Sequence, residues 1–152
     1  MEVLGLAIVV VLILVADIFF VQLGFNKPAD YRTSFLASHT AYSMLSTFLR
    51  TSANECFYLS MTELIQDCGQ GKRIVCNDGK DSCSYVNATS KEIFSKTLNS
   101  WNREYQFVVY ADPRYPLINI SEKCTSKKES ESGNYVIPAS SSPIYVRLDI
   151  CI

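Results

Sequence analysis

Several residue types and motifs that build catalytic or binding sites are scarce or missing from this sequence. Its 152 residues contain one histidine, His39, and no G-x-S-x-G elbow, Walker loop or G-x-G-x-x-G motif. A Ser/His/Asp or Cys/His catalytic set would have to run through that one histidine. The net charge is −1, and no basic cluster exceeds the pair Lys127-Lys128, so the positive stripe of a nucleic-acid groove is absent. The sequence therefore predicts neither an enzyme nor a nucleic-acid-binding protein.

Metal chemistry also has few candidate ligands in the sequence. Zinc sites usually use closely spaced cysteine pairs, and no C-x-x-C motif occurs. The segment from Asn77 to Asp81, with acids around Gly79, is similar to part of a calcium loop, but it lacks the full spacing and the closing glutamate. We therefore interpret this segment as a structural turn, and we predict no metal and no other cofactor.

Six cysteines all lie in the later part of the chain, after a long apolar N-terminal stretch. In a chain with an export-like start, an even number of cysteines predicts up to three disulfide bonds in an oxidising compartment. Spacing alone does not determine the pairing. We expect local closure of Cys56 with Cys68 and of Cys76 with Cys83, and a bond between Cys124 and Cys151 that ties a loop to the final strand.

Two N-x-[ST] sequons begin at Asn87 (Asn87-Ala88-Thr89) and at Asn119 (Asn119-Ile120-Ser121). Such triplets also arise by chance, so each is a weak signal alone. Together with the cysteines they predict an extracellular domain that carries glycans at Asn87 and Asn119.

The chain begins with an apolar stretch from Val3 to Phe25, interrupted by Asp17 and Gln22, and no Lys or Arg precedes Lys27. As a helix it would be ~34 Å long, enough to cross a ~30 Å hydrocarbon layer. A signal peptide or membrane anchor ordinarily carries basic residues ahead of its apolar core. We therefore expect either that a basic leader has been removed or that the helix does not stay in a bilayer.

Two acidic residues in this stretch need an explanation, because a carboxylate in an apolar environment normally finds a partner or takes up a proton. Glu2 would lie at the positive end of the helix dipole, where it could offset charge or simply sit among lipid headgroups. Asp17 lies about five turns into the helix. It either pairs with a group on a neighbouring helix or is tolerated in its protonated form.

The segment from about Ala29 to Thr51 has one apolar stripe and is predicted to be an amphipathic helix. The expected buried residues are Tyr31, Phe35, Tyr42, Leu45 and Leu49. Between the two helical stretches, Gly24 and Pro28 favour a kink or a short unwound turn. The two stretches therefore form either a membrane helix followed by a separate surface helix, or one long, bent rod.

The rest of the chain alternates helix and strand signals. Capping boxes predict helix starts at Ser60-Met61-Thr62-Glu63, for a helix to about Asp67, and at Thr89-Ser90-Lys91-Glu92. The second of these helices places Phe94, Leu98, Trp101 and Tyr105 on one side, which we interpret as core. Strands are predicted at Gln106–Ala111, Leu117–Ile120, Tyr135–Ile137 and Ile144–Ile152, with loops at 71–84 and across most of 121–142. This pattern is typical of an α+β domain with a small antiparallel sheet.

The opening Met1-Glu2-Val3-Leu4-Gly5-Leu6-Ala7-Ile8-Val9-Val10-Val11, followed by an amphipathic helix and a disulfide-bonded α+β domain, resembles a processed archaeal type IV pilin. The resemblance implies a lollipop-shaped fold. Residues 1–28 would form an apolar helix that lies in the membrane before assembly and in the filament core afterwards. Residues 29–152 would form the extracellular domain.

The resemblance also implies the partners of the chain. A prepilin peptidase removes a short leader in that family, the assembly machinery then bundles the helices into a homo-oligomeric surface filament, and Glu2 would neutralise the α-amine of a neighbouring subunit. The implied assembly interface comprises Glu2, Val3, Leu4, Leu6, Ile8, Val11, Leu14, Asp17 and Phe20. Two alternatives remain, namely a membrane-anchored extracellular binding domain and a minor pilin or pseudopilin.

Overall fold

A computed structural model describes residues 11–15, 17, 31–122, 124 and 130–151, and it gives residues 31–37 by their backbone alone. The chain divides into two compact units, Met1–Thr33 and Ser34–Ile152. Residues 11–15 and 17 of the first unit are helical. No helix within the described ranges is both long enough and apolar enough to span a membrane. Most of the predicted apolar helix, and the predicted kink between Gly24 and Pro28, lie outside the described residues.

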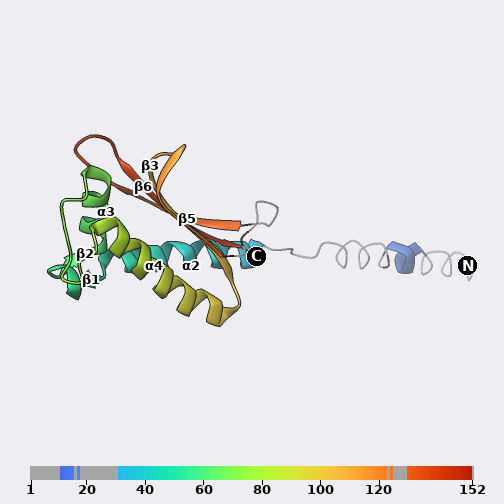
Figure 1. The fold of residues 1–152 in the computed structure, drawn as a ribbon. Coiled ribbons are helices and arrows are strands. Elements are labelled where there is room, and N and C mark those ends of the chain that lie inside the picture. Colours follow the sequence, from blue (N-terminus) through green and yellow to red (C-terminus); the bar gives the residue numbers. More distant parts are fainter. Residues whose placement is uncertain (1–10, 16, 18–30, 123, 125–129, 152) are drawn as a thin grey trace, which may run out of the picture. The chain divides into compact units, whose positions relative to one another are not determined.

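The second unit, which we call the head, is an α+β domain with antiparallel sheets, as the sequence predicts (Figure 1). Its helices lie on one face of a four-stranded sheet. The elements in chain order are α2 (Tyr31–Arg50), β1 (Ser52–Ala53), the 3-10 helix η1 (Asn54–Cys56), β2 (Leu59–Ser60), α3 (Met61–Gln70), α4 (Ser82–Leu98), the 3-10 helix η2 (Asn99–Trp101), β3 (Glu104–Asp112), β4 (Tyr115–Glu122), β5 (Ser130–Ile137) and β6 (Ile144–Cys151).

The large sheet has the strand order β4-β3-β6-β5, and every neighbouring pair is antiparallel. Phe107 on β3 stands opposite Ile120 on β4 and opposite Leu148 on β6. Since strand residues alternate between the two faces of a sheet, this register places alternate apolar side chains toward the helices. All three of these residues are buried.

An aromatic cluster fills the space between the helices and the sheet. The ring centroids of Phe48 on α2 and Phe94 on α4 are 5.1 Å apart, and Phe94 lies 5.1 Å from Phe107 and 5.9 Å from Tyr105. Tilted and edge-to-face pairs at these distances stabilise a core beyond the area that they bury. The cluster joins α2, α4 and β3 into one core.

Helix α2 confirms the predicted amphipathic helix but presents a somewhat different face. Leu45 and Leu49 are buried as predicted, together with Ala41 and Phe48. Tyr42, predicted to be buried, is exposed, because the buried stripe follows residues 41, 45, 48 and 49 at steps of three and four. The side chains of residues 31–37, which include the predicted core residues at 31 and 35, are outside the description.

The predicted start of the helix at Thr89 is wrong. Helix α4 begins at Ser82, where the Asp81 side chain accepts a hydrogen bond from the Ser84 backbone N–H at 3.1 Å. An aspartate at this position satisfies a free N–H group of the first turn. The Ser90 hydroxyl instead donates to the Val86 carbonyl, four residues earlier, as a serine within a helix does. The capping box predicted at Ser60 is confirmed, since both reciprocal hydrogen bonds between Ser60 and Glu63 are present. Helix α3 runs to Gln70 rather than to about Asp67.

Strand β5 confirms the predicted strand at Tyr135–Ile137 but begins earlier, within the predicted loop, and pairs with β6 from Ser130 opposite Cys151 to Ile137 opposite Ile144. It is an edge strand in the described sheet, and only Gly133 and Ile137 of its residues are buried, so its composition can be largely polar. A Cβ atom at Gly133 would come within 2.6 Å of the Ala41 carbonyl carbon on α2. Glycine therefore allows the α2 backbone to lie directly on the sheet at this strand.

Candidate functional site

Residues Val11 to Val15 form the described part of the predicted assembly interface. Their five consecutive apolar side chains are 47–63% exposed. Successive helix residues are 100° apart, so five of them cover the whole circumference. Within the described part of the chain, no side of this segment is covered. The segment therefore presents apolar surface in every direction, which is unfavourable in water.

The structure places three of the nine predicted interface residues. Val11, Leu14 and Asp17 are helical and exposed. The other six fall outside the described residues, namely Glu2, Val3, Leu4, Leu6, Ile8 and Phe20. The described interface thus consists of an apolar helical surface and one carboxylate close to it in the sequence.

The six cysteines form three disulfide bonds, Cys56–Cys76, Cys68–Cys83 and Cys124–Cys151. The last pair confirms the prediction, and the other two predicted pairs are wrong. The predicted pairs between neighbouring cysteines are wrong because the chain leaves α3 in a loop that turns back toward η1 before α4 begins. The returning loop lies against η1, where the Asn77 N–H donates to the Glu55 carbonyl at 2.7 Å. The packing of α3 on α4 brings Cys68 to Cys83.

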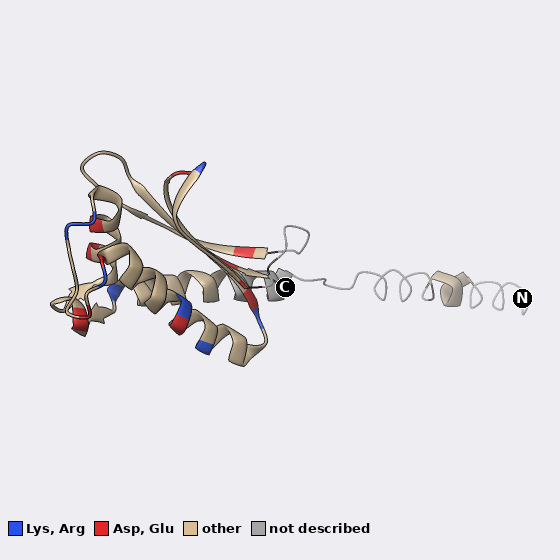
Figure 2. Cartoon of the chain, in the orientation of Figure 1, with Lys and Arg blue, Asp and Glu red and all other residues tan. Residues whose placement is uncertain are grey.

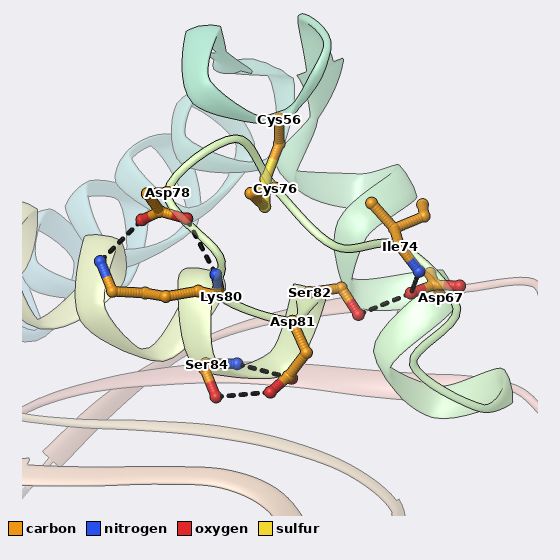
Figure 3. The surroundings of a disulfide bond; sticks show 9 residues. All are labelled: Cys56, Asp67, Ile74, Cys76, Asp78, Lys80, Asp81, Ser82 and Ser84. Carbon is orange, nitrogen blue, oxygen red and sulfur yellow. Dashed lines mark hydrogen bonds and ion pairs between the residues drawn. A yellow bond between two sulfur atoms is a disulfide. The ribbon is translucent and has the colours of Figure 1, made fainter.

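The loop between α3 and α4 is organised by three aspartates (Figure 3). Asp67 accepts hydrogen bonds from the Ile74 N–H at 3.0 Å and from the Ser82 hydroxyl at 2.6 Å, so it joins the end of α3 to the start of α4. Asp78 pairs with the Lys80 ammonium at 2.7 Å, and this interaction lowers the pKa of Asp78. The Ser84 hydroxyl and N–H lower the pKa of Asp81. The segment from Asn77 to Asp81 is thus a turn, as predicted, and the additional role of Asp67 was not predicted.

The aromatic pair Phe57-Tyr58 stands out in this disulfide-bonded region. Both residues have left-handed backbone, with φ of 56° and 59°, and their side chains are 62% and 74% exposed. This conformation is unfavourable for bulky residues, and strained backbone is common at functional positions. The Cys56–Cys76 bond and the Tyr58 N–H bond to the Ala53 carbonyl hold the pair in place. This pair is not among the residues predicted from the sequence, and no motif around it signals the backbone conformation.

An apolar groove of about 290 Å³ lies between α2 and α4. Met44, Phe48, Ile93, Phe94 and Trp101 supply its apolar lining. The sequence predicts Phe94, Leu98, Trp101 and Tyr105 as core, and the structure buries all of these except Trp101, which is 57% exposed. The prediction of one helix through these four residues is wrong, because α4 ends at Leu98, Trp101 closes a 3-10 turn beyond it and Tyr105 lies on β3.

A second groove, of about 470 Å³, brings the two sequons together. Asn87 and Lys91 from α4 line it with residues 119–122 of β4. Both asparagines are exposed. The Asn119 side-chain oxygen accepts a hydrogen bond from the Gln106 amide at 3.3 Å. Although the sequons are 32 positions apart in the sequence, the packing of α4 beside β4 therefore places them at one site.

Residues of both charge signs are interspersed along the described part of the head (Figure 2). Lys96 pairs with Glu92 and Arg114 pairs with Asp112, at 2.7 and 2.8 Å, and both pairs are exposed. Such pairs contribute little to stability. The described residues include no group of three or more His, Cys, Asp or Glu side chains that could hold a metal ion. His39, through which a catalytic set would have to run, is exposed on α2.

Comparisons with protein families, with curated proteins and with solved structures find no match to this chain. The functional argument therefore depends on the residues themselves.

Proposed function

We propose that this chain is the structural subunit of an extracellular type IV pilus-like filament, which polymerises through its apolar N-terminal helix. The supporting observation is the exposure of Val11 to Val15 on every side of a helix. The head, by contrast, has a complete core of its own. Apolar surface that is exposed in the described part of this helix is suited to contact with copies of the same helix.

After export, the apolar helix is stabilised when its surface is removed from water. Burial of apolar surface is favourable by ~25 cal/mol per Å² relative to water, whereas lipid and a bundle of helices are nearly equivalent. The subunit would therefore rest in the cytoplasmic membrane before assembly and become a lollipop-shaped part of a cell-surface filament afterwards. The resemblance to archaeal pilins assigns removal of a leader to a prepilin peptidase, and neutralisation of a neighbouring α-amine to Glu2.

The head supports an extracellular location. Its three disulfide bonds are typical of oxidising compartments. The two exposed sequons favour the same location. In the assembled filament the heads would form the outer surface and be available for adhesion.

Replacement of Asp17 by lysine tests this function. Asp17→Lys would place a cation without a designed partner in the filament core, and burial of such a charge is costly. We expect negative-stain images of cells and sheared surface fractions to show filaments for the wild type and for the uncharged control Asp17→Asn. They should show none for Asp17→Lys.

The head provides the internal control for this experiment. Circular dichroism of Asp17→Lys should match the wild type, because Asp17 lies outside the head. Normal filaments from Asp17→Lys would remove this residue from the interface. Absence of filaments from the wild type as well would argue against the filament function itself.

A second candidate function is a membrane-anchored extracellular binding domain, and the exposed pair Phe57-Tyr58 favours it. Sequencing of the N-terminus of the exported protein distinguishes the two functions. A leader cut before Met1 favours a pilin, and a retained basic extension favours an anchor. The same images separate a major pilin, found along whole filaments, from a minor pilin or pseudopilin.

A further inference from the structure

The two asparagines of the groove between α4 and β4 differ in their backbone. Asn87 lies within α4 (Ser82–Leu98), whereas Asn119 lies within β4 (Tyr115–Glu122). An N-glycan transferase must hold the asparagine amide and the hydroxyl two residues later together. A sequon can therefore react only where its asparagine side chain and its Ser or Thr side chain point in similar directions.

Helix geometry separates the two groups of the first sequon. Residues two apart in a helix point about 200° from each other. The structure agrees, since Asn87 is exposed and Thr89 is half-buried. The backbone around Asn87 is also held in place, because the Ser90 hydroxyl donates to the Asn87 carbonyl at 3.2 Å. The Cys68–Cys83 bond anchors the first turn of the same helix.

Strand geometry brings the groups of the second sequon together. Residues two apart in a strand lie on the same face, and Asn119 and Ser121 are both exposed. In the sheet that the structure describes, β4 has β3 as its one strand neighbour, so no described strand pairs with its other edge, which lies along the groove beside α4. The hydrogen bond from Gln106 engages the Asn119 oxygen rather than the amide nitrogen, which is the reacting atom.

We propose that the groove is an N-glycosylation site with two unequal acceptors, in which Asn119 is modified in the folded protein and Asn87 only before α4 forms. The donor is an oligosaccharide carried on a polyprenyl phosphate. The asparagine amide nitrogen forms a bond to C1 of the first sugar, and the bond from C1 to the phosphate oxygen breaks. The lipid phosphate leaves with the bonding electrons, and the amide proton passes to a base of the transferase.

The surroundings suit a sugar at Asn119. A groove of about 470 Å³ is of the size that accommodates small ligands. Lys91 and Glu122 on its lining supply a donor and an acceptor for sugar hydroxyls. A glycan there would also cover the free edge of β4, and a covered edge does not pair with strands of other molecules. The assignment holds whether or not the chain assembles into filaments.

The test uses the full chain, purified without glycans in detergent micelles with its disulfide bonds intact. A transferase and a lipid-linked oligosaccharide are chosen that modify both sequons when the chain is reduced and alkylated. Peptide mass spectrometry then measures the occupancy of each asparagine in the oxidised chain. We expect at least about tenfold higher occupancy at Asn119, because α4 must open locally before Asn87 can react.

Matched variants identify the acceptors. Ser121→Ala keeps Asn119 but removes its sequon, and should lower the total modification of the oxidised chain at least about tenfold. Thr89→Ala keeps Asn87 but removes its sequon, and should leave the glycan occupancy of Asn119 in the oxidised chain unchanged. Asn134, exposed on β5 without a sequon, serves as the internal negative control. Equal occupancy of both sequons in the oxidised chain, or an unmodified Asn119, would overturn the proposal.

Discussion

Residues 11–15 and residues 41–49 are both helical and rich in apolar side chains, but their surroundings differ. In α2, Ala41, Leu45, Phe48 and Leu49 are buried against the head's own sheet and helices. The apolar side chains from Val11 to Val15 are exposed in all directions. The comparison separates two uses of apolar surface. One use stabilises the domain itself, and the other, under the proposed function, supplies the surface through which copies of the chain assemble.

The largest expected effect comes from a substitution in the core of the head. Phe94→Ala should lower the free energy of unfolding by about 3–5 kcal/mol, because it leaves a cavity in the aromatic cluster. Trp101→Ala, from the same predicted stripe but exposed, should change it by less than about 1 kcal/mol. Urea unfolding followed by circular dichroism measures both values. Equal losses would show that exposure does not distinguish these side chains.

The stability of the head at alkaline pH should depend on the buried hydroxyl of Tyr105. Burial raises the pKa of Tyr105 to about 12, with a further contribution from the Glu122 carboxylate, whose oxygen accepts from the Tyr105 hydroxyl at 3.4 Å. Between about pH 10 and pH 12 the unfolded chain loses this proton while the folded chain keeps it. Stability should therefore fall across this window, by at most about 3 kcal/mol, and should be unaffected by this group below pH 10.

The matched variants for this prediction are Tyr105→Phe and Tyr115→Phe. The urea midpoint of Tyr105→Phe should depend less on pH between 10 and 12 than that of the wild type. The exposed Tyr115 provides the control, and its variant should follow the wild type. A wild-type midpoint that stays constant up to pH 12 would contradict the assigned shift.

The smallest expected effects concern helix starts at the surface. Ser60→Ala removes a capping box that is present, and should cost about 1 kcal/mol. Thr89→Ala changes a residue inside α4, and should be neutral or stabilising by a few tenths of a kcal/mol. Thermal unfolding compares the two variants. A loss at Thr89 as large as that at Ser60 would restore the predicted helix start at residue 89.

Much of the head could be predicted from the sequence because its strands carry strong signals. The alternation of Ile144, Val146, Leu148 and Ile150 predicts β6, and its bounds agree within one residue. Strand β5 lacks that signal, since an edge strand keeps few side chains in the core. The sequence does not reveal the start of α4, because Asp81 has two roles. It ends the turn that the sequence predicts, and it also caps the helix that follows.

Contacts between distant segments were harder to predict. The pairing of Cys68 with Cys83 depends on how α3 packs on α4, and that of Cys56 with Cys76 depends on how the returning loop lies against η1. The spacing of the cysteines in the sequence contains neither contact. The meeting of Asn87 and Asn119 in one groove likewise requires the tertiary fold. The left-handed backbone of Phe57 and Tyr58 could not be predicted, because neither Phe nor Tyr favours a positive φ and no glycine stands there.

The most direct test of the central proposal is a cryo-electron-microscopy reconstruction of filaments purified from the cell surface. We predict that Val11 and Leu14 of each copy contact the N-terminal helices of neighbouring copies along the filament axis, with the heads outside. Filaments in which these side chains remain exposed, or which are held together by contacts between heads alone, would contradict it.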